Sequence, residues 1–309
     1  MQTAESDNFS KTLNYGQTLF QDACLINLVV NSILTGDQHG AYVFDWNIIG
    51  AHGTQFHPDY NYEDARLLLQ LSLMVTNANY REISLGAPEW LIDTPLSYST
   101  CPVINIITNS NKTGSKYQMV LAHVLYNERA NVAFIVFSGT VDACMVGIDL
   151  AYRQDEITGI LNYFPGMKAH KGIHAAYLSI REQLIQTILP YINRKAQLII
   201  TGHSLGAALS NFCALDLAYY NPLHYSFASP LVFNPATAEN FERLVKWSYR
   251  VANLSDLVTL APLPIMPNKD TFCHVGKMIM FQNNLGDYRE NHALSYMKMY
   301  NIPYVELPK

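Results

Sequence analysis

The order of apolar and polar stretches along the 309-residue chain predicts strands that alternate with helices. The run 132–137 (VAFIVF) is entirely apolar, and 197–201 (QLIIT) has an apolar centre; both are typical of strands buried on both faces. Further strands are expected within 224–230, 247–254 and 272–281. Helices are expected at 62–77, 172–189, 208–220 and 291–300. This alternation favours an α/β fold with a mostly parallel central sheet flanked by helices.

The N-terminal half of the chain contains a predicted hairpin and a predicted loop. Residues 117–140 read as a hairpin whose second strand is the buried run at 132–137, and residues 87–102 read as a loop. The first sixty residues carry less pattern, although 20–34 could form a helix. We therefore divide the chain into an N-terminal extension (1–60), helical in part and packed on the core, and a main domain (61–309).

Composition narrows the classes of function. Half of the residues are apolar, the net charge is −5 and the pI is near 6.0, and no cluster of Lys and Arg suggests a nucleic-acid partner. The five cysteines are an odd number without a CxxC pair, so we expect reduced thiols and a cytoplasmic or intracellular location. Neither a signal peptide nor a transmembrane segment is recognisable, while secretion by a non-standard route stays open.

The strongest chemical signal is one serine between two glycines, where a strand passes into a helix. Ser204 lies between Gly202 and Gly206 in the sequence GHSLG. Glycines allow strand and helix to approach closely, and the tight turn exposes the hydroxyl beside the positive end of the helix. This is the pattern of a G-x-S-x-G nucleophile elbow. A glycine-rich turn with an idle serine is the structural alternative.

A nucleophilic serine needs a histidine base. In hydrolases with this motif, the chain order is the serine, then an Asp or Glu, then the histidine. His292 comes after the last predicted strand and at the start of the last helix, where a loop can bring it to the strand ends. His224 comes too early in the chain. His274 lies inside a predicted strand and reads as a half-buried structural residue.

The acid that orients this base is expected between the nucleophile and the base. Asp256 follows a predicted strand and precedes a proline-rich loop, so it is the first choice. Asp216 lies in the helix after the elbow and points elsewhere. Asp270 and Asp287 remain alternative loop acids.

Two backbone donors are expected around the developing oxyanion. One is the N–H of Leu205, the residue that follows the nucleophile. The other is Thr140 at the end of the buried strand, where Gly139 allows a turn and the threonine offers both an N–H and a hydroxyl.

Several segments in a fixed order resemble the class 3 lipases, the fungal-lipase-like branch of the α/β-hydrolases. The nucleophile region LIITGHSLGAAL is very close to the signature of that family, and VAFIVFSGT is similar to its oxyanion strand. The other similar segments are 169–180, 225–235, 250–264, 272–281 and 291–297, and the resemblance runs from about 64 to 300.

This resemblance implies an α/β-hydrolase fold with Ser204 as nucleophile, Asp256 as acid and His292 as base. It implies oxyanion donors at Thr140 and Leu205. The same comparison assigns His170 and His274 to structural positions.

The segment after the oxyanion turn is the lid in the resembling family, and it usually carries a Trp. Here it reads VDACMVGIDLAY, without Trp, and its lid candidates are Asp142, Met145 and Val146. An apolar segment at this place can cover the serine and rearrange at a lipid surface. It can equally belong to the core.

These residues predict a serine hydrolase of esters with an apolar acyl part, which works through an acyl-enzyme and needs neither metal nor cofactor. The resemblance to the class 3 lipases implies lipid esters, either acylglycerols or phospholipids, as the substrates. The expected partners are the lipid or ester substrate and, transiently, a lipid surface; the oligomeric state is not predicted. A retired hydrolase scaffold used for binding or signalling is the alternative from another class, and acyl transfer to an alcohol is a third. His52, His57 and Asp59 could bind a metal but read as turn residues.

Overall fold

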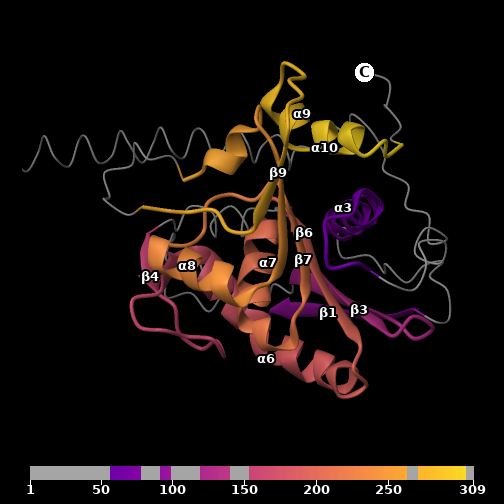
Figure 1. The fold of residues 1–309 in the computed structure, drawn as a ribbon, viewed down its shortest axis with the longest axis vertical. Coiled ribbons are helices and arrows are strands. Elements are labelled where there is room, and N and C mark those ends of the chain that lie inside the picture. The colour runs from indigo at the N-terminus through magenta and orange to yellow at the C-terminus, as the bar shows by residue number, and fades with distance from the viewer. Residues whose placement is uncertain (1–55, 78–90, 99–118, 140–152, 263–270, 304–309) are drawn as a thin grey trace, which may run out of the picture.

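A seven-stranded sheet forms the centre of the protein (Figure 1). The computed structural model describes residues 56–77, 91–98, 119–139, 153–262 and 271–303. The order of the strands across the sheet is β1 (Leu91–Tyr98), β2 (Met119–Asn127), β3 (Val132–Phe137), β6 (Gln197–His203), β7 (Leu223–Phe227), β8 (Trp247–Asn253) and β9 (Lys277–Phe281). The first three strands are antiparallel, and those from β3 onward run parallel. The predicted α/β architecture is confirmed.

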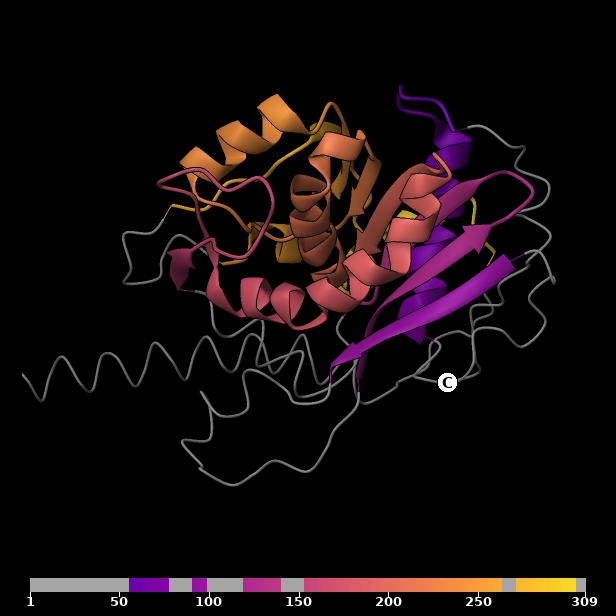
Figure 2. The ribbon, with the colours of Figure 1, turned by 90° about the horizontal axis from the view of Figure 1, so that it is seen from below.

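Helices cover both faces of this sheet, as Figures 1 and 2 show. One face carries α3 (Tyr62–Asn77) and α10 (Leu294–Met299), and the other carries α6 (Lys171–Asn193), α7 (Leu205–Asp216) and α8 (Pro235–Leu244). The remaining elements are β4 (Gln154–Glu156), β5 (Lys168–His170), α9 (Tyr288–His292) and the 3₁₀ helices η1 (Ala218–Tyr220) and η2 (Leu257–Leu260). No helix in the described ranges is long and apolar enough to cross a lipid bilayer.

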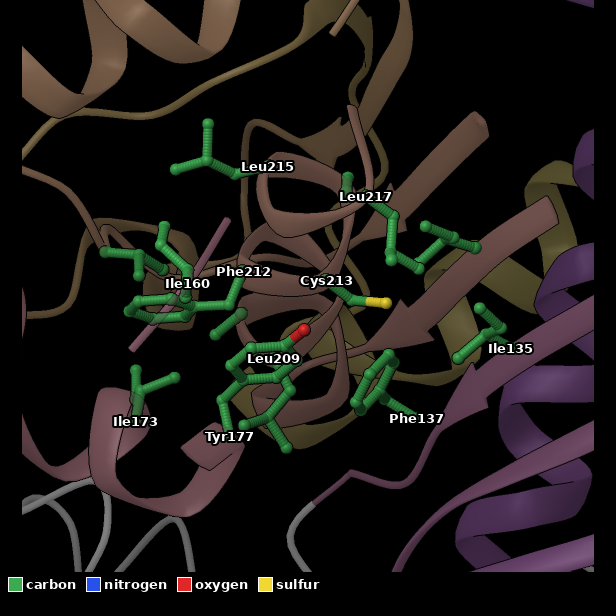
Figure 3. Packing of buried hydrophobic residues seen from close by; sticks show 14 of the residues in the cluster. Ile135, Phe137, Ile160, Ile173, Tyr177, Leu209, Phe212, Cys213, Leu215 and Leu217 are labelled. Atoms are coloured by element: carbon green, nitrogen blue, oxygen red, sulfur yellow. The ribbon is translucent and has the colours of Figure 1, made fainter. Parts of the chain in front are cut away.

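Helix α7, which follows Ser204, lies in the interior of the protein. Every residue of α7 is buried, and Phe212 stacks on Tyr177 of α6 with ring centroids 5.8 Å apart (Figure 3). The buried polar side chains of α7 are hydrogen-bonded: Ser210 to His224, Asn211 to Ser229 and Asp216 to Arg181. Because α7 begins at the elbow, this packing fixes the position of Ser204.

Helix α3 matches its predicted bounds. Asn61 caps it by accepting hydrogen bonds from the N–H groups of Glu63 and Asp64, two acidic residues that suit the positive end of a helix. Its apolar face packs on β3 and β6. Just before the helix, Phe56 meets Phe134 of β3 edge-to-face, with centroids 5.4 Å apart.

The expected loop at 87–102 was wrong over part of its length, because β1 forms an edge strand there. Pro95 obscured the strand in the sequence, since proline cannot donate to a sheet ladder. An edge strand tolerates it. The strand pairs with β2 from Leu91 to Tyr98, with one irregularity after Leu96.

Two predicted bounds near the C-terminus also need correction. The predicted strand at 272–281 begins only at Lys277, because Gly276 takes φ +85° and interrupts the extended backbone. His274 therefore precedes the strand instead of lying in it. The single helix expected at 291–300 is two helices, since Ala293 separates α9 from α10 with φ −121° and ψ −65°.

Candidate active site

Ser204 is the single residue between β6 and α7. Its backbone has φ 60° and ψ −126°, a conformation that residues other than glycine rarely adopt. Its N–H donates to the carbonyl of Phe227 at 3.0 Å, and its carbonyl accepts from the N–H of Ala207 at 3.0 Å. The sheet and the helix thus hold the strained residue from both sides.

The two flanking glycines are required by space. A Cβ added to Gly202 would overlap the carbonyl group of Gly206. A Cβ added to Gly206 would overlap the carbonyl of Phe137 and would lie 2.9 Å from the carbonyl carbon of Ser138. The end of β3 is therefore packed directly on the elbow.

The structure brings the three predicted triad residues together. His292 Nε2 lies 2.7 Å from Ser204 Oγ, and His292 Nδ1 lies 2.9 Å and 3.1 Å from the two carboxylate oxygens of Asp256. An ionised carboxylate only accepts hydrogen bonds, so Nδ1 carries the proton and Nε2 is free to accept the serine hydroxyl. All three side chains are buried.

Two further donors hold the carboxylate of Asp256. The N–H of Val258 donates to Oδ1 at 3.0 Å, and the hydroxyl of Tyr296 donates to Oδ2 at 2.9 Å. The same tyrosine oxygen accepts the N–H of Asn253 at 3.0 Å. Burial and the charge of Asp256 raise the pKa of Tyr296, so the hydroxyl stays a donor. Sequence reasoning did not find Tyr296.

Asn253 joins the segment of the acid to the segment of the base. Its amide donates to the carbonyl of Asn291 at 3.2 Å, to Ser295 Oγ at 2.9 Å and to the carbonyl of Asn283 at 2.8 Å. Its side-chain oxygen accepts the N–H groups of Ser255 at 3.1 Å and Asn283 at 3.0 Å. A buried asparagine with five hydrogen-bond contacts to four residues fixes the distance between the two segments.

His203 is hydrogen-bonded to the backbone of His292. Its Nε2–H donates to the backbone carbonyl of His292 at 2.8 Å, and the two rings lie 4.9 Å apart. Burial, reinforced by the nearby His292, lowers the pKa of His203 to about 3. The ring is therefore neutral at ordinary pH and adds no charge beside the base.

The predicted oxyanion donors lie partly outside the described residues. Leu205 is the first residue of α7, so its N–H has no partner within the helix. Thr140 and the lid candidates Asp142, Met145 and Val146 lie outside the described ranges.

The alternative bases His224 and His274, and the structural His170, have other surroundings. His274 is half-buried and contacts the backbone of Thr259. His224 lies between Ser210 Oγ, 2.9 Å from Nε2, and Ser248 Oγ, 2.8 Å from Nδ1. His170 accepts the N–H of Ile173 at 3.4 Å and caps α6. Neither His224 nor His170 is hydrogen-bonded to Ser204.

The alternative acids have structural contacts as well. Asp216 is completely buried, and its two oxygens accept from Nε and Nη2 of Arg181 at 2.6 Å and 3.1 Å. It also accepts the Tyr177 hydroxyl at 2.7 Å. Asp287 caps α9, and Asp270 lies outside the described residues.

The weak metal hypothesis gains no support from the described residues. Among them no group of three or more His, Cys, Asp or Glu side chains could hold a metal ion, and His57 and Asp59 belong to no such group. His52 lies outside the described ranges.

Residues 134–266 match the model of the family described as Lipase (class 3). A lipase of Rhizomucor miehei is 31% identical over 175 residues, which are 53% of this chain and 45% of the relative. Phospholipase A1-II 5 of Oryza sativa subsp. japonica is 27% identical over 126 residues, which are 36% of this chain and 26% of the relative. The matched part of the chain thus spans less than half the length of these curated relatives.

Solved structures agree on the fold. The Rhizomucor miehei lipase propeptide complex superposes with a TM-score of 0.55 at 20% identity. The match covers 83% of this chain and 87% of the chain in that structure. A triacylglycerol lipase whose catalytic centre is a serine protease triad superposes with a TM-score of 0.53 at 24% identity, covering 72% and 80%. The predicted α/β-hydrolase fold is confirmed.

Proposed function

We propose that this chain, whose residues 134–266 match the class 3 lipase family, hydrolyses lipid esters with Ser204 as the nucleophile. One observation carries this proposal: an unbroken chain of hydrogen bonds runs from Asp256 through His292 to Ser204 at a strained strand-to-helix turn. A serine becomes nucleophilic when a base accepts its proton and a carboxylate orients that base.

The proposed reaction has two halves. His292 Nε2, 2.7 Å from Ser204 Oγ, takes the hydroxyl proton while the oxygen attacks the ester carbonyl. Asp256 stabilises the imidazolium, which then protonates the leaving alcohol. Water, deprotonated by His292, then attacks the acyl-enzyme, and the carboxylic acid product leaves as Ser204 regains its proton. The N–H of Leu205 stabilises the oxyanion together with Thr140, whose role is proposed from the sequence.

The substrate class is proposed as acylglycerols or phospholipids. The names of the relatives support both groups, since lipases and phospholipases A1 occur among them. Exposed leucines beside the acid support a transient contact with a lipid surface: Leu254, Leu257 and Leu260 are each at least 50% exposed. Asp142, Met145 and Val146 remain proposed lid residues. The N-terminal extension, the intracellular location and the absence of a nucleic-acid partner remain predictions.

Hydrolysis of a series of p-nitrophenyl esters from acetate to palmitate tests this function. Wild-type protein should release p-nitrophenol, and Ser204→Ala should abolish the turnover while the fold is retained. The acyl chain of the best substrate separates an esterase from a lipase. A folded wild-type protein that hydrolyses neither these esters nor an emulsified triacylglycerol would instead support the retired scaffold.

A further inference from the structure

Two hydroxyl groups lie on the face of α3 that packs against the sheet. Ser72 and Thr76 are one helical turn apart among leucines, and Ser72 is completely buried. A buried hydroxyl costs free energy unless it is hydrogen-bonded. Their partners therefore explain why this apolar face contains polar side chains.

Outside α3, the partners of these hydroxyls lie on the strand that leads to Ser204 and on the segment after β3. Ser72 Oγ donates to the carbonyl of Leu68 at 2.8 Å and lies 3.3 Å from Thr201 Oγ1 of β6, three residues before the nucleophile. Thr76 Oγ1 donates to the carbonyl of Ser72 at 2.8 Å and accepts the N–H of Gly139 at 2.8 Å. One helix thus contacts the nucleophile strand and the turn after β3.

Gly139 is wedged between this helix and the elbow. A Cβ at this position would lie 3.2 Å from the carbonyl oxygen of His203 and 3.3 Å from Thr76 Cγ2. The residue before it is also tied down, because the N–H of Ser138 donates to the carbonyl of Leu121 at 2.8 Å. Since Thr76 accepts the N–H of Gly139, this N–H is not available to an oxyanion. The next residue in the sequence is Thr140, the donor that is proposed from the sequence.

We infer that Thr76 is a positioning residue for the proposed oxyanion donor: by holding the N–H of Gly139, it fixes the residue that directly precedes Thr140 in the sequence. This inference rests on the proposed function. An oxyanion donor contributes most when it is fixed before the reaction, because no reorganisation is then needed in the transition state. Loss of the Thr76 hydroxyl should therefore lower kcat and leave the binding of substrate unchanged.

The kinetic test compares three variants on the best p-nitrophenyl ester. Thr76→Val keeps the shape but removes the acceptor, and it should lower kcat about tenfold with KM changed less than about twofold, a smaller loss than the 10²–10³-fold cost of deleting an oxyanion donor itself. Thr76→Ser keeps the hydroxyl and should stay within about twofold of wild type. Thr187→Val is the matched control, because Thr187 makes the same bond to a helix carbonyl, that of Gln183 at 2.8 Å, on the exposed side of α6.

Affinity for an alkyl boronic acid, which forms a tetrahedral adduct with the serine, should fall by the same factor as kcat in Thr76→Val. The inference would be overturned by a folded Thr76→Val protein that retains its kcat, by a loss confined to KM, or by an equal loss in Thr76→Ser. A wild-type protein without turnover would contradict the proposed function, and with it this role.

A second measurement needs no variant. Ser138–Gly139 is the only Ser-Gly dipeptide in the sequence, so labelling serine carbonyls with ¹³C and glycine nitrogens with ¹⁵N isolates a single amide signal. We expect this amide to be protected from hydrogen exchange. Exchange as fast as in an open loop would overturn the contact between Thr76 and Gly139, even if every Thr76 variant failed to fold.

Discussion

Removing the hydroxyl of Tyr296 tests how the acid controls the base. In Tyr296→Phe, the carboxylate of Asp256 loses one donor and keeps the N–H of Val258 and the ring of His292. A carboxylate with fewer donors stabilises the imidazolium form of His292 more strongly. The pH at which kcat/KM reaches half of its maximum should therefore move upward.

The size of this change follows from the hydrogen bonds that are lost. A bond to a charged acceptor contributes about 2 kcal/mol, and one pH unit corresponds to about 1.4 kcal/mol. If about half of the bond free energy is transferred to the contact between His292 and Asp256, the acidic limb moves by roughly half a unit to one unit. The fold loses about 2 kcal/mol as well, because the N–H of Asn253 is left without its partner.

The assay is the pH dependence of kcat/KM on a soluble ester, with urea unfolding measured in parallel. Tyr300→Phe is the matched control, because Tyr300 is equally buried and shares its hydroxyl with Tyr60 at 3.0 Å, without contacting the triad. The control should lose stability and keep the wild-type pH profile. An acidic limb that stays in place in Tyr296→Phe would refute the reasoning.

Three further predictions concern the fold around the site. Gly202→Ala should fail to give a folded protein by circular dichroism, because the new Cβ overlaps backbone of α7; a folded variant would contradict the close packing of the elbow. Asp216→Asn should lower the free energy of unfolding in urea by about 2 kcal/mol, since it removes the charge that pairs with the partly exposed Arg181. The kcat should stay within about twofold, and a large drop in kcat would restore Asp216 as a candidate acid. Burial lowers the pKa of His203 and of His224 to about 3 from an ordinary value of 6.5, so the unfolded chain takes up protons first as the pH falls. Stability is therefore present above about pH 6.5 and is lost toward pH 3; urea unfolding should report a loss of about 2 kcal/mol per histidine between pH 7 and pH 5, and His224→Gln should reduce this loss, whereas an equal loss in that variant would be contrary evidence.

The triad could be proposed from sequence because each member follows a strand in a fixed order. Ser204 sits in a motif that only a strand-to-helix turn explains, and Asp256 and His292 come after later strands of the parallel sheet. The parallel ends of such strands meet at one edge, so order along the chain predicts proximity there. The structure brings these three residues within hydrogen-bonding distance.

The residues that support the triad could not be predicted in this way. Tyr296 reads as an apolar position of a terminal helix, and Asn253 reads as the polar end of a strand. Thr76 bonds to a residue 63 positions away. Contacts of this kind depend on how helices rotate against the sheet, which periodicity in one sequence does not determine.

Among the elements that sequence reasoning missed, β1 and α8 have local explanations. Pro95 hid the edge strand β1, although proline is tolerated at a sheet edge. Helix α8 carried a signal that sequence reasoning overlooked: Asn234 caps it by accepting the N–H of Thr237, and Pro235 opens its first turn.

Covalent capture of the nucleophile tests the central claim most directly. An alkyl fluorophosphonate should add one adduct mass to the intact protein, and peptide mapping should place it on Ser204. Labelling should be lost in Ser204→Ala and slowed strongly in His292→Ala, because the base activates the hydroxyl. Adduct on another residue, or a folded wild-type protein that stays unlabelled, would contradict Ser204 as an activated nucleophile.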